Sequence, residues 1–263
     1  MHSTPRELEP SRPRWWAGLL LVGVVVSYEV LVALLLSRGG VARERVHDSW
    51  AGVLYDLACG LGTIALVFAA LRLGKKPVRS NLYLAPAAWG EVLLVVVVVL
   101  ALGPWRGLIA NLVDPASGSS SSHDPTPWTA PILVLFALRG LLVPVAEELL
   151  FRGYVLSAFR SRSTILAIVV SALLFAAIHL ELRPLWFLVH LPFGLVSAYC
   201  VIRLGTIVPV IVAHAVWNLL AGLHLAPSRW FEPELLPLAA SAVILAGGLF
   251  VLTRSTRSMM GAG

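Results

Sequence analysis

Charged side chains are scarce in this sequence: they make up 13% of its 263 residues, whereas 58% of the residues are hydrophobic. Soluble domains carry about 25% charged residues, so the composition argues against a soluble protein and indicates a membrane protein. Cysteine is also rare. The two cysteines, Cys59 and Cys200, both lie within apolar runs, which argues against a disulfide-rich protein and against a zinc–cysteine site.

The net charge of +6 does not point to nucleic-acid binding, because the basic residues lie between apolar runs. In that position arginine and lysine set the orientation of membrane segments and contact lipid headgroups. We therefore expect membrane lipid and no nucleic acid among the partners. The expected location is the cell membrane, as a multi-pass integral membrane protein.

Eight apolar runs are long enough, or nearly long enough, to cross a bilayer as helices. They cover about residues 15–37, 50–73, 88–112, 129–158, 163–180, 184–203, 206–224 and 235–253. Their continuity argues against the alternating pattern of a transmembrane β-barrel. The sequence thus predicts an all-α fold, a polytopic transmembrane helical bundle of about eight spans. Basic residues are more frequent on one side of these spans, which predicts that both termini face inside.

The chain divides at a loop from Asp114 to Pro127, which contains no lysine or arginine and includes a glycine–serine stretch. This composition predicts a flexible external linker. Residues 1–128 then form an N-terminal membrane unit with three spans, residues 129–224 a core unit, and residues 225–263 a last span with a basic tail. In the N-terminal unit Glu29, Asp56 and Glu91 each stand alone, so we interpret them as interfacial or locally hydrogen-bonded carboxylates.

The core unit differs because its polar residues come in pairs with helical spacing. In Glu147-Glu148-Leu149-Leu150-Phe151-Arg152 the arginine lies four residues after Glu148, on the same helix face. Glu147 is turned by about 100° and points elsewhere. A salt bridge that lets a charged helix insert would require one glutamate, so the second one favours a chemical role.

Two further pairs occur on later spans, and each also places two polar or aromatic groups on one helix face. Phe175 and His179 can bring an aromatic ring against an imidazole, and His214 and Asn218 offer an imidazole and an amide together. Taken singly, His179 is equally compatible with a packing role, and His214 with Asn218 could instead be an interhelical hydrogen-bond pair. His190 has no such partner in the sequence, so we interpret it as a structural or supporting residue.

Together these groups suit the hydrolysis of an amide bond. A glutamate in a water-poor site can act as general base for water, and a nearby histidine can share that water or protonate the leaving amine. His214 and Asn218 can donate hydrogen bonds to a developing oxyanion, a contribution of about 3 kcal/mol. The sequence has no GxSxG motif, and no cysteine lies near the three pairs, which disfavours a covalent nucleophile.

Zinc is the alternative, with Glu147, His179 and His214 as the metal ligands. The sequence has no HExxH helix, and the two histidines lie on separate spans, so we favour a mechanism without a cofactor. A proton-coupled transporter would also place glutamate and histidine within spans, but the chain shows no inverted repeat.

The three motifs, in this order, resemble the CPBP family of intramembrane proteases, also called the ABI or CAAX-protease-like family, which includes the type II CAAX prenyl endopeptidase. The resemblance covers about residues 130–222, and Glu147-Glu148-Leu149-Leu150-Phe151-Arg152-Gly153 is a close match to the family signature. It implies an intramembrane endopeptidase that cleaves a membrane-associated peptide or protein. A non-catalytic immunity or scaffold protein that has kept the motifs is the remaining alternative.

The resemblance also implies roles for individual residues. Glu147 is expected to activate water with the help of His179, and His214 and Asn218 are expected to form the oxyanion hole. The supporting residues are expected to be Glu148, Arg152 and Phe175.

Overall fold

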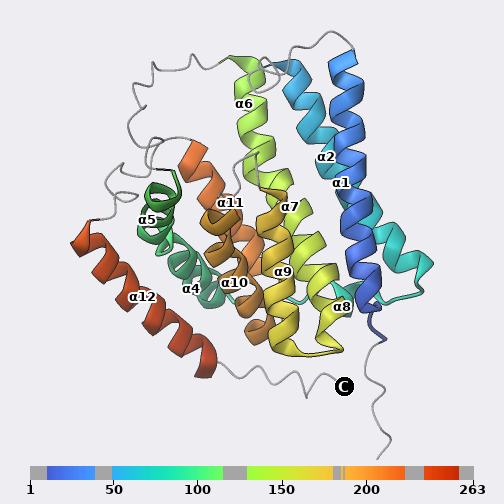
Figure 1. The fold of residues 1–263 in the computed structure, drawn as a ribbon. Helices are drawn as coiled ribbons and strands as arrows, with labels where there is room; N and C mark the ends of the chain where they lie inside the picture. The colour runs from blue at the N-terminus through green and yellow to red at the C-terminus, as the bar shows by residue number, and fades with distance from the viewer. Residues whose placement is uncertain are drawn as a thin grey trace, which may run out of the picture.

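The computed structural model describes residues 11–38, 49–114, 129–179, 185, 187–222 and 234–254. Within these ranges the chain forms helices and no strand, so the predicted all-α class is confirmed (Figure 1). Most of the predicted external linker and the tail beyond Arg254 lie outside the described residues.

The helices follow the predicted apolar runs closely, because each continuous run satisfies its backbone hydrogen bonds internally. Their bounds are α1 Trp15–Arg38, α2 Trp50–Leu73, α3 Val78–Asn81, α4 Trp89–Leu100, α5 Gly103–Val113, α6 Ala130–Ala137, η3 Leu138–Leu142, α7 Val143–Glu148, η4 Leu149–Val155, α8 Leu156–Arg160, α9 Thr164–Ile178, α10 Phe187–Leu204, α11 Val208–Gly222 and α12 Leu235–Arg254.

Two predicted runs have more internal structure than the apolar pattern indicated. The third is divided into α4 and α5 by a turn at residues 101–102. The fourth is a single helical rod from α6 to α8, in which two segments, η3 and η4, have the wider π-helical hydrogen-bonding pattern. Short π-helical segments inside α-helices are frequent at functional sites, and both of these flank the predicted glutamate pair.

Five helical segments of the described chain are long and apolar enough to cross a membrane: Trp15–Ser37, Trp50–Leu73, Trp89–Val113, Phe187–Leu204 and Leu235–Arg254. The apolar helices Thr164–Ile178 and Val208–Ala221 are shorter. The protein is therefore a multi-pass membrane protein. The total of eight spans and the inside location of both termini stay predictions.

The α6–α8 rod, α9, α10 and α11 form the centre of the bundle (Figure 1). Helices α1 and α2 lie on one flank, and α4, α5 and α12 lie on the other. Helix α9 packs along α10, α11 packs against α4, and α2 packs against both η3 and α7. Large apolar side chains on the flanking helices face outward; Leu20 of α1, for example, is 60% exposed and Leu235 of α12 is 84% exposed, as suits contact with lipid.

Candidate functional site

The paired polar residues come together in the central layer of helices. Glu147 and Glu148 end α7, and Arg152 follows in η4. Phe175 lies in the last turn of α9, and His179 immediately follows that helix. The remaining pair, His214 and Asn218, lies on α11.

Glu147 faces imidazole rings from two other helices. One carboxylate oxygen, Oε2, lies 3.7 Å from Nε2 of His214, and the other, Oε1, lies 3.9 Å from Nε2 of His179. The Glu147 side chain is 17% exposed, so it points into the bundle rather than outward. These distances exceed those of direct N–H···O hydrogen bonds, so the carboxylate faces both imidazoles without bonding directly to either Nε2.

His214 connects the two neighbouring glutamates. Its Nδ1 lies 2.8 Å from Oε1 of Glu148, while its Nε2 faces Glu147. Glu148 also lies 3.3 Å from Nε of Arg152, and both of these side chains are fully buried. The contact between Glu148 and Arg152 follows from their spacing of four residues. The contact between Glu148 and His214 joins α7 to α11 and was not predicted.

The orientation of His179 is set by its own helix. Its Nδ1 lies 2.9 Å from the carbonyl oxygen of Phe175, which can only accept a hydrogen bond, so Nδ1 is the donor. In the neutral ring Nε2 then has no proton, and this atom faces Glu147. The predicted contact between the Phe175 and His179 rings is present, with centroids 4.8 Å apart. The ring of His190 stacks on that of His179 with centroids 4.2 Å apart, which agrees with its interpretation as a structural or supporting residue.

Aromatic rings surround the buried arginine. The guanidinium of Arg152 lies 4.1 Å from the centroid of Phe175 and 5.6 Å from that of Phe193. Phe193 also contacts the ring of His214 at 4.7 Å, so it links the arginine to the histidine. Sequence reasoning missed Phe193. The available signal was its position three residues after His190 on one face of the same span.

Asn218 makes a contact that its pairing with His214 did not predict. Its Nδ2 donates a hydrogen bond of 2.9 Å to the backbone carbonyl of Arg139, in η3. In an α-helix the Arg139 carbonyl would accept from the N–H of Val143, but here that N–H bonds to the carbonyl of Leu138, five residues back. Pro144, the next residue, has no N–H to offer. The π-helical turn and the proline thus leave one partly buried acceptor, which the Asn218 amide satisfies.

A residue of the predicted N-terminal unit also contacts η3. Asp56 of α2 accepts a hydrogen bond of 2.7 Å from Nε of Arg139, and the Asp56 side chain is 11% exposed. Of the two expectations for Asp56, local hydrogen bonding is wrong, because its partner lies on η3, and an interfacial location stays a prediction. Glu91 does bond locally, since its Oε2 accepts from the backbone N–H of Ala88 at the start of α4.

The zinc alternative requires Glu147, His179 and His214 as ligands, and these side chains are of the types that zinc accepts. Over the described ranges, no group of three or more His, Cys, Asp or Glu residues is spaced to hold a metal ion. The side chains as placed thus form no ready-made metal site, and the zinc alternative stays a prediction.

Comparison with known proteins places this cluster within one family segment. Residues 128–220 match the model of the family described as Type II CAAX prenyl endopeptidase Rce1-like. Neither the search of curated proteins nor the search of solved structures gives a match. All seven residues singled out in the three motifs lie inside the matched segment, which supports a CAAX-type intramembrane protease. The resemblance of the three motifs to the type II CAAX prenyl endopeptidase family is thus confirmed over residues 128–220.

Proposed function

We propose that this protein is an intramembrane endopeptidase in which Glu147 activates the water molecule that attacks a peptide bond. The observation that carries the proposal is the position of the Glu147 carboxylate, which faces the Nε2 atoms of His179 and His214 from two other helices. A carboxylate and an imidazole acceptor that face each other 3.9 Å apart suit the binding and deprotonation of water.

In the proposed first step, Glu147 takes a proton from water as the water oxygen bonds to the carbonyl carbon of the peptide. The carbonyl oxygen then carries a negative charge. In the second step, the bond between carbon and nitrogen breaks, and the amine leaves with the proton that Glu147 removed. His179 relays this proton, because its Nε2 faces the carboxylate and its Nδ1 stays bonded to the Phe175 carbonyl.

The oxyanion is stabilised by donors on α11. His214 donates from Nε2 in its imidazolium form, in which both ring nitrogens carry a proton. Its Nδ1–H continues to donate a hydrogen bond to Glu148. Asn218 has two amide N–H groups. One is held by the Arg139 carbonyl, which fixes the orientation of the amide, and the other is the donor to the oxyanion. Fixed donors of this kind stabilise the transition state because they need no reorganisation during the reaction.

The substrate is a membrane-associated peptide or protein, and the protein works in the cell membrane. Support comes from the lipid-facing helices around the cluster and from the family match over the segment that contains every proposed site residue. Buried Glu148 and Arg152, with Phe175 beside them, act as supporting residues that hold His214 in place.

The test is cleavage of lipidated and transmembrane peptides by the purified protein, with products identified by mass spectrometry. We expect the wild type to cleave and Glu147→Gln to be inactive, because an amide does not take the proton from water. Glu91→Gln is the matched control, since it removes a carboxylate that caps α4 outside the cluster. Thermal unfolding of each variant shows that it is folded.

Three outcomes would change the proposal. Cleavage by Glu147→Gln at the wild-type rate removes Glu147 as the base. Loss of wild-type activity with a chelator, and its return with zinc, supports the metalloprotease alternative. A folded wild type that cleaves no peptide of the panel supports the non-catalytic immunity or scaffold alternative.

A further inference from the structure

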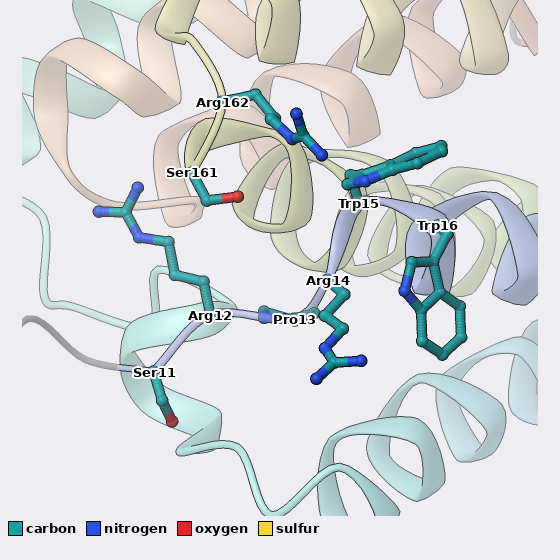
Figure 2. A pocket seen from close by; sticks show the side chains of 8 residues that line it. All are labelled: Ser11, Arg12, Pro13, Arg14, Trp15, Trp16, Ser161 and Arg162. Atoms are coloured by element: carbon teal, nitrogen blue, oxygen red, sulfur yellow. The ribbon is translucent and has the colours of Figure 1, made fainter.

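A basic hollow lies at the end of the bundle where α1 begins, apart from the glutamate–histidine cluster. Its volume is about 490 Å³, within the range of roughly 300–1,000 Å³ that is usual for small-molecule sites. It is formed by the segment that leads into α1 and by the turn between α8 and α9 (Figure 2). The residues that matter most for its chemistry are Arg12, Arg14, Arg162, Trp15 and Trp16.

The charge around this hollow is of one sign. Three arginines, Arg12, Arg14 and Arg162, belong to its lining, and among the described residues no aspartate or glutamate does. Like charges around one space repel each other, so an anion bound there would be stabilised. Ser11 and Ser161 also belong to the lining (Figure 2), but the Ser161 hydroxyl already donates to the carbonyl of Ala158 at 3.1 Å.

Other arginines at the same end of the bundle are engaged by the protein itself. The guanidinium of Arg160 lies 6.0 Å from the ring centroid of Tyr83. Arg203 donates to the backbone carbonyls of Leu252 and Thr253. Arg162 has a ring contact of its own, with Trp15, so what distinguishes Arg12, Arg14 and Arg162 is that all three line one hollow.

The two tryptophans relate the hollow to the membrane. They are the first residues of α1, a span of 23 residues, and indole rings favour the boundary between lipid and water. Arg162 lies over the ring of Trp15 at 5.7 Å, which fixes the arginine at this boundary. From Trp16, an exposed apolar stripe continues along one face of α1 through Leu20 and Val24, which are 60% and 43% exposed.

We propose that the hollow binds the phosphate-bearing headgroup of an anionic phospholipid, with an acyl chain along the stripe Trp16–Leu20–Val24. The positive charge of the arginines matches the phosphate, and the stripe matches the chain. A free phosphate would use the first feature but not the second. The site is independent of the proposed protease activity, because none of its residues belongs to the glutamate–histidine cluster.

The test is native mass spectrometry of the purified full chain with phosphatidylglycerol or phosphatidylcholine. We expect the wild type to retain one tightly bound phosphatidylglycerol. The triple variant Arg12→Gln, Arg14→Gln, Arg162→Gln should bind it about 100-fold more weakly, since each basic residue near a membrane surface contributes about a fivefold preference for anionic lipid. Equal binding of phosphatidylglycerol by the wild type and the triple variant would overturn the proposal.

A matched control separates the hollow from the general charge of this end of the bundle. The variant Arg72→Gln, Lys75→Gln, Lys76→Gln removes three charges at the end of α2, which lies at the same end as the start of α1 (Figure 1). We expect it to keep the tightly bound lipid. Loss of the lipid in this control, to the same extent as in the triple variant, would overturn a specific site.

Two further measurements use the wild type alone and do not depend on how the variants fold. Excess inorganic phosphate should leave phosphatidylglycerol bound, and its displacement by phosphate would show that the hollow takes a free anion instead. A phosphatidylglycerol with a photoreactive headgroup should label residues 11–16 and 161–162. Labelling confined to other segments would place the lipid elsewhere and refute the assignment.

Discussion

Replacing Pro144 by alanine tests whether the π-helical turn of η3 positions Asn218. The substitution supplies a backbone N–H five residues after Arg139, whose carbonyl now accepts from the Asn218 amide. The new N–H can bond to that carbonyl, or the turn can return to the α-helical pattern, in which Val143 bonds to it. In both cases the Asn218 amide competes with a backbone N–H for this acceptor, and its hydrogen bond is weakened.

The expected effect follows from the strength of one neutral hydrogen bond, about 0.5–1.5 kcal/mol. If that energy is lost from the positioning of an oxyanion donor, kcat for peptide cleavage falls by a factor of about 2 to 10. KM should change less, because the amide acts on the oxyanion of the transition state rather than on the bound peptide. The assay is steady-state cleavage of the best peptide from the panel.

Pro209→Ala is the matched control. Pro209 is buried, as Pro144 is, but it is the second residue of α11, where a helix has no backbone acceptor for an N–H. The same side-chain atoms are removed from a buried place, so a general packing defect would lower kcat in both variants. We expect wild-type kcat for Pro209→Ala.

A double-mutant cycle provides the refutation. If Pro144 acts through Asn218, then Pro144→Ala has no further effect on kcat in an Asn218→Ala background. Additive losses in the double variant, or an unchanged kcat in Pro144→Ala itself, would show that the open carbonyl of η3 does not position the amide.

Three further predictions concern the free energy of unfolding, measured by denaturant titration in detergent micelles. Arg152→Met should lower the free energy of unfolding by about 3–5 kcal/mol, because Glu148 is left fully buried without its cation. Adding Glu148→Gln should restore most of the loss. An Arg152→Met variant as stable as the wild type would contradict this prediction. Gly140→Ala should lower the free energy of unfolding by about 1–3 kcal/mol, because a Cβ at this position would lie 2.3 Å from Leu219 Cδ2. Adding Leu219→Ala should restore stability by removing this clash. A double variant that is no more stable than Gly140→Ala would refute the clash as the cause. Asp56→Asn should lower the free energy of unfolding by less than about 1 kcal/mol, because the side chain of its partner Arg139 is 43% exposed. A larger loss would mean that the ion pair is effectively buried.

The sequence by itself predicted the helical class and the positions of the apolar segments, because length and hydropathy are local properties of a chain in lipid. It also identified the pairs Glu148 and Arg152, and Phe175 and His179, whose contacts follow from one turn of helix. The match of residues 128–220 to the protease family agrees with these motifs.

Only the tertiary structure decided how residues from different helices meet. The link from Asp56 through Arg139 to Asn218 joins α2, η3 and α11, and none of these contacts has a fixed spacing along the chain. The π-helical turn forms when a backbone N–H bonds to the carbonyl five residues back instead of four. Packing against other helices determines which bond forms, and the hydropathy of the sequence does not indicate it. For the same reason, sequence spacing showed that Glu147 and Glu148 point apart, whereas the packing of α7 against α11 brought both to opposite nitrogens of the His214 ring.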